Sequence, residues 1–316
     1  MDHYDSDSDS DSILLSHTTW QDIVEGLENN TLIKVEYKDY AKGRPKNSPV
    51  LYLDAQTYPI DSKGAIAIAA ALETNTSCQH CEFYSNLFGK EGAEAIASAL
   101  LKNTTLKFLS LNTNNIGNEG IEAIANALLI NKTLTSLDLS NNGREEDADR
   151  YVESIVNMMN VNTSLTKFRF GLNGLTEPAI ISIIKVLSFR NHSLTSVDLN
   201  FNHIPHREDD EISENLKAAV SDLIQNNFSL TSFELFSRGY DRYLFRFSQA
   251  EKLQYDIDKL MNERNRKIQK EALVATTQYM RIWGSQMSNL IYDQFEDEAM
   301  RFYRNMILQI ASKYMQ

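Results

Sequence analysis

A segment of about 28 residues recurs along this chain and restricts the folds available to it. Seven copies begin at residues 50, 78, 106, 134, 165, 194 and 230, each with a short run such as LKFLSLNTN or LTSLDLSNN. A unit this short cannot bury both of its faces alone, so neighbouring copies must complete its core. The recurrence therefore predicts a stacked array of repeats.

Each copy changes its hydrophobic spacing partway through. Leu106, Leu109 and Leu111 occupy positions 1, 4 and 6 of one copy, and positions 4 and 6 have the period-2 spacing of a strand. Ile121 and Ile124 then follow at the spacing of a helix. One unit is thus predicted to contain a strand, a turn, a helix and a second turn.

Two sets of asparagines keep fixed places in the repeat. Asn at position 9 is expected to be buried and to bond the backbone of the neighbouring copy; these residues are Asn86, Asn114, Asn142, Asn173 and Asn202. A second set precedes Ser or Thr by two residues near the end of each helix and resembles a glycosylation signal. Because this set follows the repeat, we expect it to close the helices in the left-handed conformation instead; its members are Asn29 (displaced by one residue), Asn75, Asn103, Asn131, Asn162, Asn191 and Asn227.

With these features the chain resembles the leucine-rich repeat family, in its ribonuclease-inhibitor-like subclass. The resemblance covers roughly Trp20 to Arg238. It implies an α/β fold in which parallel strands line the concave face of a curved solenoid and helices cover the convex face. The motif is specific for a fold and not for a function.

Three regions are expected along the chain. Residues 1–16 include an Asp-Ser run that cannot bury apolar surface and is predicted to be a disordered acidic tail. Residues 17–247 form the predicted solenoid, with an N-terminal cap around a helix that starts near Trp20. Residues 248–316 contain no proline and read as an all-α C-terminal extension, either a cap on the open end of the solenoid or a partner-binding module.

Charge and composition exclude several classes of protein. There are 43 acidic and 31 basic side chains, a net charge of −12, which disfavours binding to nucleic acid or to anionic lipid. No apolar run reaches the roughly 18 residues of a spanning helix, and no classical signal peptide is visible at the N-terminus. We therefore expect a cytoplasmic protein without membrane insertion.

Catalytic and metal-binding patterns are scarce in the sequence. Cys78 and Cys81 form a C-x-x-C, but they occupy positions 1 and 4, where other copies hold Leu, so we expect core packing. A strand is also expected to hold the two thiols too far apart for a redox pair. No nucleotide-binding, zinc-protease or serine-hydrolase motif is present, so we expect no enzyme, no metal and no cofactor.

The predicted concave face carries the clearest functional signal. Position 5 reads mostly acidic in these seven copies and in a degenerate first copy around Leu32. Adjacent like charges across parallel strands lower stability, so a functional reason is worth seeking. Aromatic side chains are expected beside this acidic column, and His80 precedes Glu82 at position 3. The position-5 residues are Glu36, Asp54, Glu82, Ser110, Asp138, Arg169, Asp198 and Glu234, and the aromatic residues are Tyr52, Tyr84, Phe108, Phe201 and Phe236.

Acid with exposed aromatics is typical of a surface that binds a basic protein. The leading hypothesis is a non-enzymatic protein-interaction scaffold, and a simple solubilising surface is the alternative. The high Asn content and the C-terminal NERNRK and QFEDEAM stretches resemble Legionella-type leucine-rich repeat effectors. That resemblance implies export into a host cell without a classical signal peptide, and binding of a host protein.

A second hypothesis is a regulator of a partner enzyme, such as a small-GTPase activator or an inhibitor, with Arg144 and Arg207 as candidate arginine fingers. The first hypothesis, the interaction scaffold, makes a prediction of its own. Simultaneous charge reversal at Asp54, Glu82 and Asp138 is expected to abolish partner binding without unfolding the protein.

Overall fold

The structure is a computed structural model that describes residues 20–30, 50–52, 59–143, 151–203, 212–236, 253–268 and 270. The chain divides into two compact units, Met1–Tyr255 and Asp256–Gln316. In the second unit, residues 256–268 are helical and continue a helix that starts at residue 253. The boundaries predicted at residues 16 and 247 stay predictions.

Strands and helices alternate throughout the described part of the first unit. The strands are β1 Val50–Tyr52, β2 His80–Glu82, β3 Phe108–Ser110, β4 Ser136–Asp138, β5 Lys167–Arg169, β6 Ser196–Asp198 and β7 Ser232–Glu234. The helices are α1 Trp20–Glu28, α2 Ser62–Thr74, α3 Gly89–Lys102, α4 Gly117–Ile130, α5 Val152–Val161, α6 Glu177–Phe189 and α7 Glu214–Asn226.

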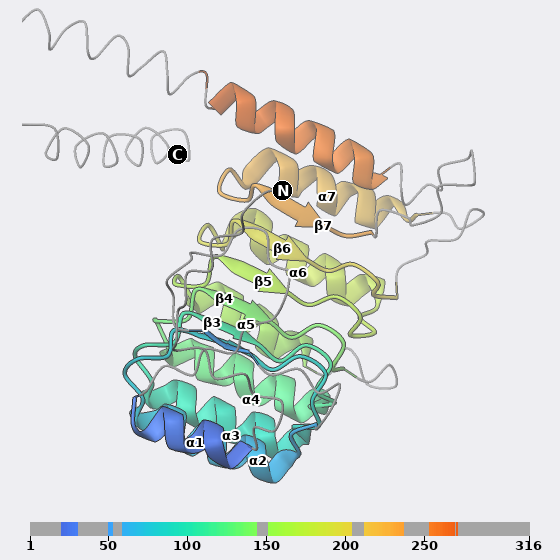
Figure 1. The fold of residues 1–316 in the computed structure, drawn as a ribbon. Helices are drawn as coiled ribbons and strands as arrows, with labels where there is room; N and C mark the ends of the chain where they lie inside the picture. Colours follow the sequence, from blue (N-terminus) through green and yellow to red (C-terminus); the bar gives the residue numbers. More distant parts are fainter. Residues whose placement is uncertain are drawn as a thin grey trace, which may run out of the picture. The chain divides into compact units, whose positions relative to one another are not determined.

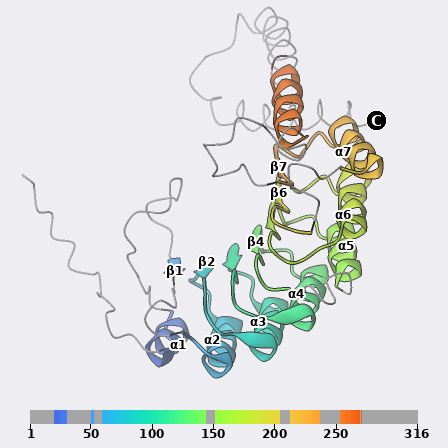
Figure 2. The same cartoon turned by 90° about the vertical axis from the view of Figure 1, so that its right-hand side faces the viewer.

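The seven strands form one parallel sheet in chain order, from β1 to β7. Each strand pairs with the next at equivalent positions, so that Leu109 faces Leu137 and Leu137 faces Phe168 across the ladder. In Figure 2 the strands lie on the inner side of an arc and the helices lie on its outer side. This is the predicted α/β leucine-rich repeat solenoid, and in Figure 1 its successive coils stack from α2 at the bottom to α7 at the top.

The first copy is in a different register from the predicted one. Tyr52 pairs with Glu82 and Val50 pairs with His80, so Tyr52 occupies position 5 and not position 3. The prediction that Asp54 aligns with Glu82 was therefore wrong by two residues. The sequence around Val50 offers two overlapping apolar series, and only the strand pairing distinguishes them.

The predicted inward positions make the core. Leu109 and Phe168 at position 4 and Leu111 at position 6 have no exposed surface. Adjacent helices approach closely where glycine faces alanine: a Cβ added to Gly120 would lie 2.9 Å from the Cβ of Ala93. Small residues on the helix faces thus let the coils stack.

The position-9 asparagines bond the neighbouring coils, as predicted. Asn173 is fully buried, and its Oδ1 accepts the N–H groups of Asn142 at 2.9 Å and Gly143 at 2.7 Å. Its Nδ2 donates to the carbonyls of Leu139 and Phe170, each at 3.1 Å. Asn142 makes the same type of contact to Asn114 and Leu111. These amides satisfy backbone groups that the three-residue strands leave unpaired.

The second set of asparagines closes the helices, but not in the left-handed conformation predicted. Asn131 has φ −63° and ψ 125°, which is extended backbone. This geometry turns its side chain into the coil: Nδ2 donates to Leu100 O at 2.7 Å, and Oδ1 accepts the Leu134 N–H at 2.9 Å. The six members from Asn75 to Asn227 are at most 6% exposed, so their amide nitrogens are not accessible for glycosylation. Asn29, after α1, is exposed and does not share this burial.

A glutamine amide performs a similar role after the last strand. Gln254 is buried, and its Oε1 accepts the N–H groups of Leu235 at 2.8 Å and Phe236 at 3.1 Å. Its Nε2 donates to Phe233 O at 2.9 Å. The backbone after β7 therefore finds partners although the repeat pattern no longer supplies an asparagine.

Candidate functional site

Two rows of side chains project from the concave surface of the sheet. In strands β2 to β7 the central residue points into the core, while the first and third residues face the opposite side. We name these the concave rows. From β2 to β7 the first row is His80, Phe108, Ser136, Lys167, Ser196 and Ser232, and the second row is Glu82, Ser110, Asp138, Arg169, Asp198 and Glu234.

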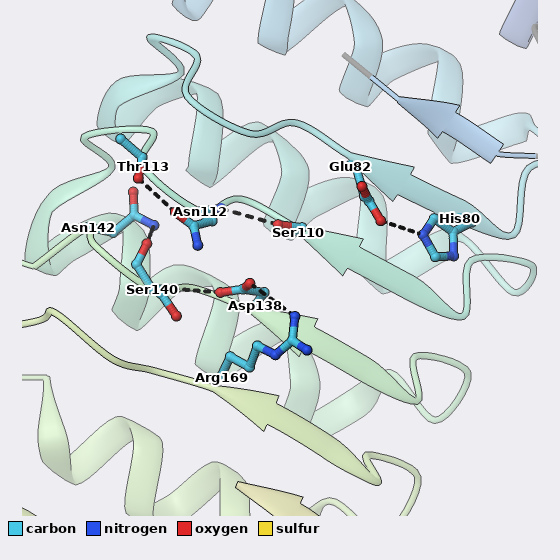
Figure 3. A network of polar contacts seen from close by, with 9 residues as sticks. All are labelled: His80, Glu82, Ser110, Asn112, Thr113, Asp138, Ser140, Asn142 and Arg169. Carbon is cyan, nitrogen blue, oxygen red and sulfur yellow. Dashed lines mark hydrogen bonds and ion pairs between the residues drawn. The ribbon is translucent and has the colours of Figure 1, made fainter. Parts of the chain in front are cut away.

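The β2–β3 end of the rows is already paired within the chain. The His80 ring stacks on Phe108 with centroids 3.9 Å apart and planes within 1°. His80 Nε2 lies 2.9 Å from Glu82 Oε1 (Figure 3). Tyr84, two residues beyond Glu82, is 43% exposed. The sequence placed these four residues on one face, and the structure brings His80, Glu82 and Phe108 into direct contact.

The centre of the second row is more buried than predicted. Ser110 and Asp138 are each only 6% exposed, although position 5 was expected to face solvent. Asp138 Oδ1 accepts the Ser140 N–H at 2.9 Å, two residues along the chain, and Oδ2 lies 3.8 Å from Arg169 Nη1 (Figure 3). Asp138 therefore stabilises the turn after β4 and neutralises Arg169.

This turn contact gives the acidic column a structural reason. Asp198 Oδ1 likewise accepts the Asn200 N–H at 3.0 Å. In both coils a short acid at position 5 bonds the N–H at position 7, where the strand ends and the backbone needs an acceptor. The like charges for which the sequence suggested a functional reason are thus partly required by the fold.

The β5–β7 end holds charge that is poorly compensated. The pKa of Asp198 is raised, first by burial, which disfavours the carboxylate, and also by the neighbouring carboxylate of Glu234. The Asn200 N–H and the Arg169 guanidinium act in the opposite direction without cancelling these effects. Arg169 itself has a side chain that is 63% exposed. A cation from outside the chain would relieve the repulsion between Asp198 and Glu234.

Asp198→Asn is expected to increase the stability of the protein at pH 7. Because the folded-state pKa of Asp198 is raised, its carboxylate lowers stability above that pKa, and the effect disappears as pH falls and the group is protonated. The asparagine oxygen can still accept the Asn200 N–H. Urea midpoints at pH 7 and at successively lower pH should show the difference between variant and parent shrinking. A difference that grows on acidification would contradict this assignment.

Exposed aromatic and aliphatic residues follow the strands at position 8. Phe201 is 55% exposed, whereas Phe236, which we had predicted to be exposed, is 5% exposed and buried. Leu172 occupies the position of Phe201 in the preceding coil and is 49% exposed, which was not predicted from the sequence. Both residues have positive φ, 55° for Leu172 and 54° for Phe201, which is unusual for bulky side chains. The sequence did contain a signal for this exposure. Position 8 holds the polar residues Ser85, Thr113 and Asn141 in the earlier coils, so an apolar residue there departs from the repeat.

The two cysteines pack in the core, as predicted, but their thiols lie closer together than predicted. Cys78 and Cys81 are 5% and 0% exposed. Their Sγ atoms lie 3.5 Å apart, in van der Waals contact, so the expectation that a strand would separate them was wrong. Burial raises the pKa of the Cys81 thiol, as does the contact with Cys78, which disfavours the reactive thiolate.

Several predicted residues lie outside the described part of the chain. These are Glu36, Asp54, Arg144 and Arg207, and β1 with Tyr52 is described by its backbone alone. Within the described ranges, no group of three or more His, Cys, Asp or Glu side chains could hold a metal ion. Across those same ranges, no helix is both long enough and apolar enough to cross a membrane.

Comparison with known families agrees with the observed repeat. The model of the tropomodulin/leiomodin (TMOD/LMOD) leucine-rich domain matches residues 57–174, and a leucine-rich repeat model matches residues 190–204. A search of curated proteins found no match. The chain therefore contains leucine-rich repeats over most of its described length.

Two solved structures are similar to this chain. One is titled leiomodin-1 actin-binding site 2, with 24% identity, coverage of 54% of this chain and 88% of that chain, and a TM-score of 0.42. The other is the tropomodulin C-terminal domain from Caenorhabditis elegans, with 16% identity, coverage of 53% and 93%, and a TM-score of 0.39. The fold assignment does not depend on these two structures; it rests on the strand pairing and the family models.

Proposed function

We propose that this leucine-rich repeat protein is a non-enzymatic interaction scaffold whose concave rows bind a basic surface of a partner protein. The rows form a continuous surface across the parallel strands, held by a rigid backbone ladder. They combine carboxylates with aromatic side chains at one end, which is the composition of many protein-binding surfaces.

The observation that carries this proposal is the pair Asp198 and Glu234. Burial raises the pKa of Asp198, and the neighbouring carboxylate of Glu234 raises it further. Arg169, the nearest basic side chain of the second row, is in contact with Asp138. Among the described residues, no ion pair with Asp198 or Glu234 would have to be displaced, so a lysine or arginine of a partner would gain favourable electrostatic energy there.

The test is a pull-down in which two double charge-reversal variants are compared with the parent chain. Glu82→Lys with Glu234→Lys changes the partly exposed ends of the second row and spares buried Asp138. The control, Glu153→Lys with Asp222→Lys, makes the same change in net charge at exposed positions on α5 and α7.

The expected result is that a partner captured by the parent is lost with the first variant, at least tenfold, and is retained by the control. Equal loss in both variants would show a nonspecific charge effect. Equal capture by both would place the binding site outside the concave rows. Circular dichroism of each variant establishes that the fold is intact.

The identity of the partner is a separate proposal. Host-cell lysate is the appropriate source if the chain is a secreted effector, and an export assay with a reporter fused to the chain tests that role directly. Purified actin is one protein to include, since one similar structure is titled as an actin-binding site. A partner that is an enzyme would favour the regulatory alternative, which predicts a stoichiometric change in its activity.

A further inference from the structure

A second surface lies where the helices end. Every described helix from α2 to α7 is followed within two residues by one of the buried asparagines. Large apolar side chains that are 39–66% exposed stand beside these asparagines in five successive coils. We name this set the helix-end rim: Leu101, Ile130, Val161, Phe189 and Phe228.

The asparagine bonds place the rim residues on adjacent coils. Asn162 Nδ2 donates to Asn131 O at 3.1 Å, and Asn227 Nδ2 donates to Asn191 O at 3.0 Å. Lys132 Nζ reaches the carbonyls of Leu129 at 3.1 Å and Val161 at 3.3 Å, so the ends of α4 and α5 are in direct contact. The rim residues therefore lie on adjacent coils that are hydrogen-bonded to one another at the helix ends.

Apolar residues at these places are not required by the helices. Thr74, Lys102 and Asn226 are the last residues of α2, α3 and α7, so polar side chains suit the same structural position. Polar and basic residues are also favoured there by the helix dipole. Ile130, which is 66% exposed at the end of α4, adds nothing to the core. Exposed apolar residues that recur at the helix ends of successive coils are typical of an interaction surface.

The charge of the rim is opposite to that of the chain. Within two residues of Asn131, Asn162, Asn191 and Asn227 the sequence contains Lys132 and Arg190 and no carboxylate. In the preceding coil Lys102 is present and pairs with Glu73 at 2.6 Å. The whole chain, by contrast, has a net charge of −12. An apolar stripe with basic side chains complements an acidic segment that has one apolar face.

We infer that the helix-end rim is a second binding surface, and that it takes an acidic amphipathic helix of a partner protein. This proposal is independent of the concave rows. Such a helix would place leucine-like side chains against Ile130, Val161 and Phe189, and carboxylates near Lys132 and Arg190. A helix of about 18 residues is about 27 Å long, enough to cross three coils whose helices pack about 8–10 Å apart.

The probes are three synthetic helical peptides of that length with a fluorescent label. The first has a leucine stripe at helical spacing with glutamate elsewhere, the second replaces glutamate with lysine, and the third replaces leucine with serine. Fluorescence anisotropy against the full chain measures their affinities. We expect the first peptide to bind at least tenfold more tightly than either of the others.

Two variants of the full chain locate the binding. Ile130→Ser with Val161→Ser should weaken binding of the first peptide at least tenfold. Ile66→Ser with Leu87→Ser is the matched control, since these residues are 45% and 56% exposed outside the rim. It should leave the affinity unchanged, as should the Glu82→Lys and Glu234→Lys variant of the concave rows. Circular dichroism on each variant excludes unfolding as the cause.

Three outcomes would overturn the inference. The control variant could lose binding as much as the rim variant, or the lysine peptide could bind best. The third is flotation of the chain with vesicles of phosphatidylcholine and phosphatidylserine, dependent on Ile130 and Val161, without binding of the acidic peptide. That result would assign the rim to an anionic membrane surface.

Discussion

Replacing Asn173 with alanine is expected to lower the free energy of unfolding by about 4 kcal/mol. The residue is fully buried, and its amide makes four hydrogen bonds to backbone groups of its own coil and the preceding one. Each buried donor or acceptor left without a partner costs about 1–3 kcal/mol, and alanine also leaves a small cavity. Neighbouring coils depend on each other for stability, so the damage should spread along the array.

Asn160→Ala provides the comparison for this variant. Asn160 is an exposed residue within α5, where alanine is the better helix former, so the change should stay within about 0.5 kcal/mol. Urea unfolding followed by circular dichroism gives both values. If Asn173→Ala shifted the urea midpoint no more than Asn160→Ala, water would be replacing the amide, and the asparagine ladder would not hold the coils together.

The repeat in the sequence was sufficient to predict the fold because each coil uses the same solution. Positions 1, 4 and 6 bury the same side of every strand, and Asn at position 9 bonds the next coil, as in Asn142 and Asn173. Once the period is recognised, stacking follows from the need to bury both faces of each unit. Local patterns and tertiary packing agree here, which is the condition for reading a fold from sequence.

The details of the site depended on contacts between coils, which one copy does not encode. Ser110 and Asp138 were predicted to be exposed because position 5 alternates with buried positions along the strand. In the structure the Asp138 side chain turns back to the N–H of Ser140 and lies against Arg169 from the next strand. Likewise, Phe236 is buried although its position suggested exposure. Alternation tells which side of a strand a residue faces, but not how much of that side is covered.

The two surfaces differ in how far the sequence could reveal them. The concave rows were found from the column of acids at position 5. The helix-end rim was not, because its members shift by up to three places relative to the asparagines, as Leu101, Ile130 and Phe228 show. Only burial distinguishes these exposed residues from core residues such as Leu100 and Leu128 nearby.

Asp138→Lys is expected to lower the free energy of unfolding by about 3–5 kcal/mol. The sequence alone had predicted that charge reversal at this residue would leave the fold intact. Asp138 is 6% exposed, accepts the Ser140 N–H and faces Arg169. A lysine would remove that acceptor and bury a second cation beside the guanidinium, and an uncompensated buried charge is strongly destabilising.

Two further substitutions separate charge from hydrogen bonding at this position. Asp138→Asn keeps an oxygen for the Ser140 N–H but loses the ion pair, so most of the stability should remain, since Arg169 is largely exposed and its pairing is screened by solvent. Glu234→Lys, at the partly exposed end of the same row, should preserve the fold. Urea midpoints for the three variants should therefore fall only for Asp138→Lys. A comparable loss for Glu234→Lys would mean that the whole column is structural, and the concave rows would then offer no free charge for a partner.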